Sequence, residues 1–262
     1  MYPVLFQIGN LKVNSWGFML ALAVLIGVIG VRRLFAREGL DSDMVYDLVL
    51  LVVVFGIIGA RLAYIITYEW ADFLAHPGSF FFLGEGLRGL VWYGGLLGGF
   101  IPGIIYIHKK KLPFWKVVDM LAPFLALGYA LVRIGCFLAG CCYGEITGGA
   151  CGVVFPGVDA FPRHPTQLYS AGLNFVLFGF LWWLYPRRKF AGQVFIAYIL
   201  GYSVYRFIVE FFRDSLIMVG PISLGQVYTL GFLLVGMVLY CWRKARVGSE
   251  PKSGDNEGSG TI

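Results

Sequence analysis

The sequence predicts an all-α, polytopic membrane protein with about seven transmembrane helices, and three observations support this fold class. The 262-residue chain is 58% hydrophobic and only 14% charged, with a mean hydropathy of +0.75. A soluble domain is usually nearer a quarter charged. Apolar runs of roughly 20 residues recur along the chain, and that length crosses the hydrocarbon core of a bilayer. Basic clusters alternate with these runs, as they do in multi-pass membrane proteins.

Each expected helix is an apolar run bounded by charged, glycine-rich or proline-containing segments. In chain order we expect helices over residues 15–35, 45–66, 89–108, 114–138, 167–185, 192–212 and 223–242. The clusters RRLFAR, HKKK, YPRRK and CWRKAR follow the first, third, fifth and seventh of these. By the positive-inside rule, every second loop is therefore cytoplasmic, with the N-terminus outside and the C-terminus in the cytoplasm. The net charge of +6 thus orients helices and does not indicate a nucleic-acid partner.

This topology predicts three outer loops, over residues 68–88, 139–166 and 213–222, within one integral-membrane domain of residues 1–247. Loop 68–88 is aromatic and rich in glycine, which suits a short element lying at the membrane interface. Loop 139–166 is longer than most loops of compact proteins, and loops of that length are usually functional or disordered. Residues 248–262 form a low-complexity polar tail that we expect to be disordered.

Six arginines stand outside the basic clusters, and an arginine inside a membrane is costly unless it meets a counter-ion, a polar cavity or an anion. They are Arg61, Arg88, Arg133, Arg163, Arg206 and Arg213. Arg133 lies near the outer end of the fourth expected helix, where it either snorkels to lipid headgroups or binds an anion. The glycines that follow it would free backbone N–H groups that suit phosphate oxygens.

The sixth expected helix carries Tyr202, Arg206, Glu210 and Arg213, spaced by four, four and three residues. This spacing places them on one helix face, where Glu210 can pair with both arginines. Such a face can be a structural ion pair inside the bundle. It can also hold an anionic ligand, because two arginines outnumber one glutamate.

Other candidates are weaker by themselves. Gly94, Gly95, Gly98 and Gly99 expose backbone to a ligand or simply pack against another helix, and Tyr93 just before them is typical of an interface anchor. Thr166 is expected to cap the fifth helix, and Gln167 has a possible functional role. Cys136, Cys141, Cys142 and Cys151 lack the paired spacing of a zinc site. A disulfide on the oxidising outer side and small-residue helix packing both stay open for them.

Four segments in this order resemble the prolipoprotein diacylglyceryl transferase family over nearly the whole chain except the tail. They are Y-G-G-L (93–96), R-I-G-x-F-x-x-G-x-x-x-G (133–144), H-P-T-Q-L-Y (164–169) and Y-x-x-x-R-F-I-V-E-F-F-R (202–213). The resemblance implies transfer of the diacylglyceryl group of phosphatidylglycerol to the lipobox cysteine of a preprolipoprotein, with release of glycerol phosphate. It also implies the bacterial cytoplasmic (inner) membrane, partners that include the lipid bilayer and lipobox signal peptides, and no metal or organic cofactor.

Carried onto this sequence, the resemblance makes Arg133 and Arg206 the pair that holds the phosphate, with Tyr93 as a further catalytic candidate. Gly144 matches the glycine that ends the signature. Tyr202, Glu210 and Arg213 match positions around the second arginine, and Gly94, Gly95 and Gln167 complete the expected substrate-binding set.

The chain departs from the family pattern at three places. Tyr93 stands where the family often has histidine, Ser15–Trp16–Gly17 where it has W-Y-G, and Cys136, Ala139 and Cys141 replace Asn, Asn and Glu in the signature. The departures keep one rival function open, a non-catalytic relative that binds lipids or signal peptides. A second rival is an anion transporter that uses the same arginines as a pathway, and the absence of an inverted repeat or of paired broken helices in the sequence speaks against it.

Overall fold

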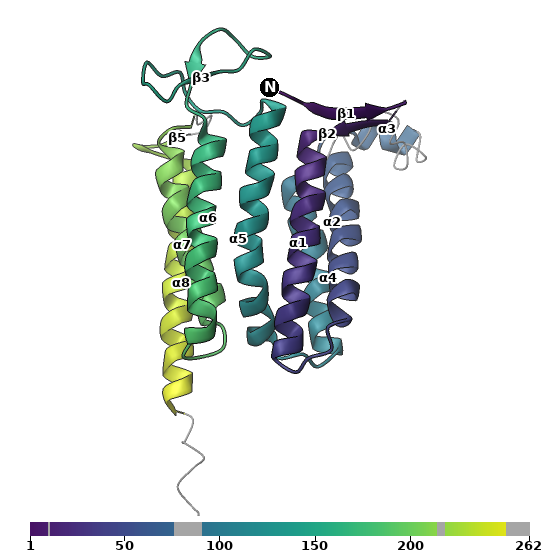
Figure 1. The fold of residues 1–262 in the computed structure, drawn as a ribbon, viewed down its shortest axis with the longest axis vertical. Helices are drawn as coiled ribbons and strands as arrows, with labels where there is room; N and C mark the ends of the chain where they lie inside the picture. The colour runs from purple at the N-terminus through teal and green to yellow at the C-terminus, as the bar shows by residue number, and fades with distance from the viewer. Residues whose placement is uncertain (10, 76–90, 214–217, 250–262) are drawn as a thin grey trace, which may run out of the picture. The chain divides into compact units, whose positions relative to one another are not determined.

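The computed structural model describes residues 1–9, 11–75, 91–213 and 218–249, and it is dominated by helices (Figure 1). Within these ranges the long helices are α1 (Ser15–Arg37), α2 (Met44–Tyr68), α4 (Trp92–Lys109), α5 (Phe114–Ala139), α6 (Thr166–Leu184), α7 (Gln193–Glu210) and α8 (Leu224–Ser249). Each coincides with one expected helix, and most ends agree within a few residues. The clear exception is α8, which runs through the expected boundary at 242 to Ser249.

Five of these helices are long and apolar enough to cross a membrane: α1, α2, α5, α8, and α6 with the 3-10 turn η2 (Tyr185–Arg187) that follows it. The chain is therefore a multi-pass helical membrane protein. The described helices α4 and α7 are 18 residues each and fall short of that standard. Glycines dilute the apolar character of α4, whereas α7 carries Arg206 and Glu210. The expectation of seven crossing helices thus stays a prediction for these two.

Short elements fill the connections. A hairpin of β1 (Val4–Ile8) and β2 (Leu11–Asn14) precedes α1. The sequence did not predict this hairpin. The expected loop 68–88 contains α3 (Trp70–Ala75), and its residues 76–90, with Arg88, lie outside the described residues. Loop 139–166 contains the antiparallel pair β3 (Val153–Val154) and β4 (Pro162–Arg163), and loop 213–222 contains β5 (Met218–Val219) and β6 (Ile222–Ser223). The expected tail begins inside α8, and its residues 250–262 are outside the description.

The chain divides into two compact units, each described here by itself. Unit 1 comprises Met1–Gly27 with Val118–Ile262, and unit 2 comprises Val28–Val117. In unit 2, α2 packs along α4 at very close range. A Cβ added to Gly94 would lie 2.3 Å from the carbonyl oxygen of Gly59, and one added to Gly98 would lie 2.4 Å from that of Phe55. Only glycine permits this approach, so the glycines of α4 have a packing role.

In unit 1, α7 lies between α6 and α8, and α5 packs against α6 and α7 through aromatic side chains. The start of α7 is tied to α5 by Asp119, which is fully buried. Its carboxylate accepts hydrogen bonds from the backbone N–H groups of Gly192 (2.7 Å) and Phe195 (2.9 Å), and the Nε atom of Arg188 lies 3.9 Å away. A buried carboxylate at a helix N-terminus is well placed for the unpaired N–H groups there.

Candidate functional site

Helices α5 and α7 of unit 1 run in the same direction and end at the same side, beside the segments that carry β3 and β5 (Figure 1). Their facing surfaces meet through tyrosines, because the rings of Tyr129 on α5 and Tyr202 on α7 lie 6.0 Å apart in an edge-to-face arrangement. Arg133 follows Tyr129 by four residues, and Arg206 follows Tyr202 by four. Each arginine therefore lies one helical turn beyond the contact between Tyr129 and Tyr202, at a similar height along the two helices.

Arg133 is half-buried, and its partners are aromatic. It donates a hydrogen bond to the hydroxyl of Tyr129, and its guanidinium carbon lies 4.8 Å from the centre of that ring. Within the described residues, no carboxylate lies within 4.0 Å of Arg133. The positive charge of Arg133 therefore lacks an acidic counter-ion in that part of the chain.

Glu210 pairs with both neighbouring arginines, as the spacing on α7 predicted. Its carboxylate lies 2.6 Å from Arg206 and 3.9 Å from Arg213, and the Glu210 side chain is only 8% exposed. The hydroxyl of Ser223 donates to Glu210 (3.3 Å), and a Cβ on Gly225 would lie 2.5 Å from the carboxylate. The start of α8 therefore closes over Glu210 and holds it against the arginines.

We call Arg133, Arg206, Glu210 and Arg213 the arginine site. Three arginines against one glutamate leave two positive charges in excess. Burial lowers the pKa of Arg213 from its usual value, and the positive charges of Arg206 and Arg133 act in the same direction. The three guanidinium groups thus share one electrostatic environment, which favours an anionic ligand.

Gly144 fastens the segment after α5 to the end of α7. Its N–H donates to the carbonyl of His164 (2.9 Å), and the N–H of the next residue, Glu145, donates to the carbonyl of Phe212 (3.1 Å). A Cβ on Gly144 would lie 2.0 Å from that Phe212 oxygen. The predicted importance of Gly144 has a steric reason, since any larger residue would push the segment after α5 away from the segment after α7.

Thr166 and Gln167 hold the same segment from α6. The Thr166 hydroxyl donates to the carbonyl of Cys142 (2.9 Å), and the Gln167 amide donates to the carbonyl of Cys141 (2.6 Å). The expected capping role of Thr166 is wrong, because Pro165 occupies the N-cap and Thr166 is bonded across to the loop. Gln167 is fully buried, and its Oε1 atom has no hydrogen-bond partner among the described residues.

Three cysteines gather where this segment leaves α5. The Sγ atoms of Cys136, Cys141 and Cys142 all lie within 4.8 Å of one another, and all five cysteines of the chain are free thiols. The disulfide considered for the outer loop is therefore absent from the structure. Hydrogen bonding to the thiols of Cys136 and Cys141 lowers the pKa of Cys142, and the charges of Arg133 and Arg213 lower it further.

Two of the other scattered arginines have acidic partners. Arg61 lies 3.4 Å from Glu69, and Arg163 lies 2.6 Å from Asp159 with its guanidinium 5.0 Å from the ring centre of Tyr143. Both pairs lie in segments predicted to be at the outer side. They fit structural roles, in contrast to Arg133.

Tyr93, Gly94 and Gly95 belong to unit 2, at the start of α4. The Tyr93 side chain is largely exposed, whereas both glycines face α2. The grouping of these three residues with the arginine site therefore remains a prediction.

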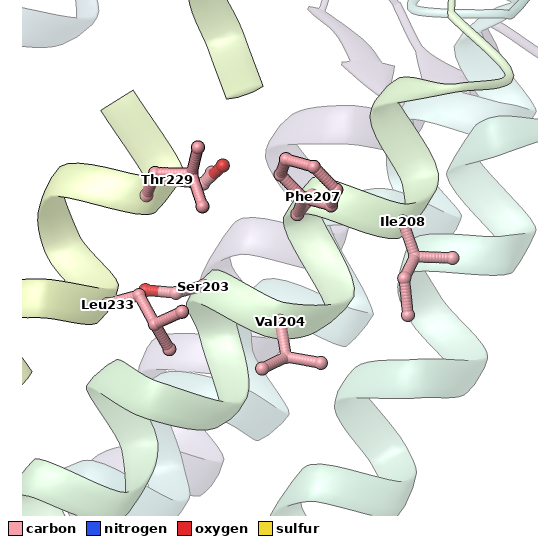
Figure 2. A pocket seen from close by; sticks show the side chains of 7 residues that line it. Ser203, Val204, Phe207, Ile208, Thr229 and Leu233 are labelled. Carbon is pink, nitrogen blue, oxygen red and sulfur yellow. The ribbon is translucent and has the colours of Figure 1, made fainter. Parts of the chain in front are cut away.

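An apolar pocket of about 260 Å³ opens between α7 and α8 (Figure 2). It is lined by Ser203, Val204, Phe207, Ile208, Thr229, Leu230 and Leu233. Its two hydroxyls donate to carbonyls of their own helices, Ser203 to Ile199 and Thr229 to Gln226, both at 2.8 Å. The pocket therefore offers apolar contact surface between the two helices.

Sequence reasoning missed Tyr129 and Ser223. Tyr129 precedes Arg133 by one helical turn, so the spacing of four residues could have identified it as a partner of the arginine. Ser223 lies across a turn from Glu210, and no local pattern indicates that contact.

Comparisons with known proteins match this chain to one family. The family model described as "Prolipoprotein diacylglyceryl transferase" matches residues 3–242. A phosphatidylglycerol–prolipoprotein diacylglyceryl transferase of Geobacter sulfurreducens is 37% identical over 244 residues, which cover 90% of this chain and 93% of the relative. Relatives with the same name from Bordetella bronchiseptica and Clostridium tetani are 37% and 36% identical over 91% and 92% of this chain, and 94% and 97% of their own lengths.

Proposed function

The chain belongs to the prolipoprotein diacylglyceryl transferase family, and we propose that it transfers the diacylglyceryl group of phosphatidylglycerol to the lipobox cysteine thiol of preprolipoproteins. In this reaction the thiolate sulfur attacks a glycerol carbon of the lipid and forms a thioether bond. The bond from that carbon to the phosphate oxygen breaks, and glycerol phosphate leaves with the electron pair. The thiol proton passes to another group or to solvent.

Arg133 and Arg206 are the residues we assign to the phosphate. Negative charge develops on the departing phosphate, and fixed cations in a site with little water stabilise such charge strongly. A guanidinium also matches the geometry of phosphate oxygens. The single observation that carries this assignment is that Arg133 is half-buried and has no carboxylate within 4.0 Å in the described chain.

The remaining predicted residues have supporting roles in this proposal. Glu210 orients Arg206 through the 2.6 Å ion pair, and Arg213 adds positive charge. Tyr202 keeps α7 in register with α5, and Gly144 and Gln167 hold the loop next to the arginines. Gly94 and Gly95 pack against α2 within unit 2, so their part in lipid binding stays a prediction.

Two routes could remove the thiol proton. Tyr93 would be a weak base near pH 7, because the reference pKa of tyrosine is about 10. Positive potential from three arginines lowers the pKa of a nearby substrate thiol instead, and the thiolate is the reactive form. We favour this electrostatic route, which needs no dedicated base and is compatible with tyrosine in place of the family's histidine.

Two further proposals concern location. The alternation of basic clusters supports an outer N-terminus, a cytoplasmic C-terminus and residence in the bacterial cytoplasmic membrane. The arginine site would then face the outer leaflet, where a lipobox emerges. The apolar pocket between α7 and α8 supports an amphiphilic substrate, since its lining is suited to an acyl chain.

One assay tests the proposed function against its rivals. The purified chain is incubated with phosphatidylglycerol and a lipobox peptide, and both the thioether adduct and the released glycerol phosphate are measured. We expect both products, and we expect Arg133→Ala and Arg206→Ala to abolish them. Absence of product from the parent would favour a transporter or a non-catalytic binding protein, and equal adduct from both variants would overturn the site assignment.

A further inference from the structure

The three cysteines of the thiol cluster (Cys136, Cys141 and Cys142) lie at a spacing that suits a metal ion. Their Sγ atoms are within 4.8 Å of one another. Zinc–sulfur bonds of about 2.3 Å place thiolates roughly 3.8–4.0 Å apart around a single ion. Small side-chain rotations would therefore bring all three sulfur atoms to one ion.

The backbone is shaped to bring these thiols together. Cys136 is buried in the last turn of α5, and the N–H of Cys141 donates to the Cys136 carbonyl (3.1 Å) as the helix ends. Gly140 (φ +75°) and Cys142 (φ +63°) both adopt left-handed conformations, which turn the chain back on itself. For a cysteine this conformation is uncommon and costs about 1–3 kcal/mol, so it persists where surrounding contacts enforce it.

Those contacts come from α6. Thr166 and Gln167 donate to the carbonyls of Cys142 and Cys141, so the strained Cys142 and the residue before it are held in place by a neighbouring helix. The sequence spacing Cys-x4-Cys-Cys does not resemble a paired zinc motif. The left-handed turn explains how it can still form a compact three-sulfur group.

Charge and hydrogen bonding favour a divalent ion over a neutral ligand. Three thiolates around a divalent ion carry one net negative charge, and Arg133 lies one turn before Cys136 on α5 to balance it. Gln167 has a fully buried Oε1 atom without a partner among the described residues. A water molecule on the fourth position of the ion would give that oxygen a donor.

We propose that Cys136, Cys141 and Cys142 bind one soft divalent metal ion of the zinc class, with the fourth position open to water. This site departs from the sequence expectation of no metal. The proposed transfer chemistry does not itself require a metal ion, although the site lies one helical turn from Arg133 and would contribute negative charge there.

The test uses the full chain in detergent, reduced and stripped of metal with a chelator. The parent is the Cys151→Ser, Cys241→Ser double variant, in which the cluster holds the only cysteines. Cadmium is titrated in, and its thiolate charge-transfer absorption is recorded. We expect one ion per chain, and we expect zinc bound beforehand to be replaced by cadmium, the softer ion. Cys141→Ser in this parent should weaken binding by at least about 100-fold, the upper end of the loss seen when ligand support is removed.

A second measurement uses the unchanged chain, so that it does not depend on the folding of a variant. Zinc is expected to slow alkylation of the three cluster cysteines by iodoacetamide, with Cys151 alkylated at an unchanged rate as the internal control. The proposal is overturned if the parent binds no cadmium, if Cys141→Ser binds it equally well, or if zinc protects Cys151 as much as the cluster. A disulfide between two of the three cysteines in chain isolated from membranes would also overturn it and assign the cluster to redox chemistry.

Discussion

Helix α5 carries one charged side chain near each end, and the two differ in the partners that the fold provides. Asp119, near the start, receives two backbone N–H groups and lies 3.9 Å from Arg188. Arg133, near the other end, has a tyrosine hydroxyl and ring but no carboxylate within 4.0 Å in the described chain. Burial of a charge is costly unless it is paired. A charge satisfied inside the fold stabilises it, whereas an unbalanced one is available to a ligand.

The sharpest test of this contrast is Arg133→Gln. We expect the transfer rate to fall by about 10²–10³, the cost of removing one group that stabilises developing negative charge. We expect thermal stability in detergent to change by less than ~1 kcal/mol, because no ion pair is broken. The two readouts are initial rates of glycerol phosphate release and the melting curve of the same preparation.

Arg163→Gln is the matched control, since Arg163 pairs with Asp159 at 2.6 Å and belongs to loop 139–166, which follows α5. Its transfer rate should stay near that of the parent. If both variants lost activity equally, the absence of an acidic partner would not distinguish functional from structural arginines in this chain.

The next largest effect is expected at Gly144, which joins the loop to the end of α7. Gly144→Ala places a Cβ 2.0 Å from the backbone oxygen of Phe212, so the two segments must move apart at a cost of about 1–3 kcal/mol or more. We expect lower thermal stability together with loss of transfer, because the loop no longer lies against the arginine site. Gly148→Ala is the control, since a Cβ there meets nothing within 4 Å. Equal behaviour of the two variants would show that the contact with Phe212 does not matter.

At the other end of α5, Asp119→Ala should lower thermal stability and leave the transfer rate unchanged, which is the reverse of the result expected for Arg133→Gln. It leaves the N–H groups of Gly192 and Phe195 without their carboxylate acceptor, which costs about 1–3 kcal/mol. The transfer rate per folded molecule should be unchanged. Asp43→Ala removes a carboxylate that is 76% exposed, and it should cost less than ~1 kcal/mol. A large loss of transfer rate in folded Asp119→Ala protein would contradict the assignment of Asp119 to stability and of Arg133 to function.

The helices were predictable because apolar length and basic boundaries are local properties of the chain. The pairing of Glu210 with both arginines was predictable for the same reason, since spacings of four and three bring side chains together along a helix. Arg213 keeps its contact with Glu210 although it lies three residues beyond the end of α7. Thr166 was misassigned as a cap because its partner, the Cys142 carbonyl, is 24 residues away in sequence. The thiol cluster was likewise missed because it depends on a left-handed cysteine, which no spacing rule anticipates.

The smallest expected effect is at Tyr93, which lies in unit 2 and tests whether the charges of unit 1 suffice for the chemistry. A general base contributes about 10²–10⁴ to a rate. If the arginines instead lower the pKa of the substrate thiol, Tyr93→Phe should stay within about threefold of the parent at every pH, because no proton passes through its hydroxyl. The measurement is the pH profile of thioether formation for both proteins. A loss in the range of a general base that is restored by raising the pH would assign the proton to Tyr93. The catalytic set would then have to include unit 2 as well as the charges at the ends of α5 and α7.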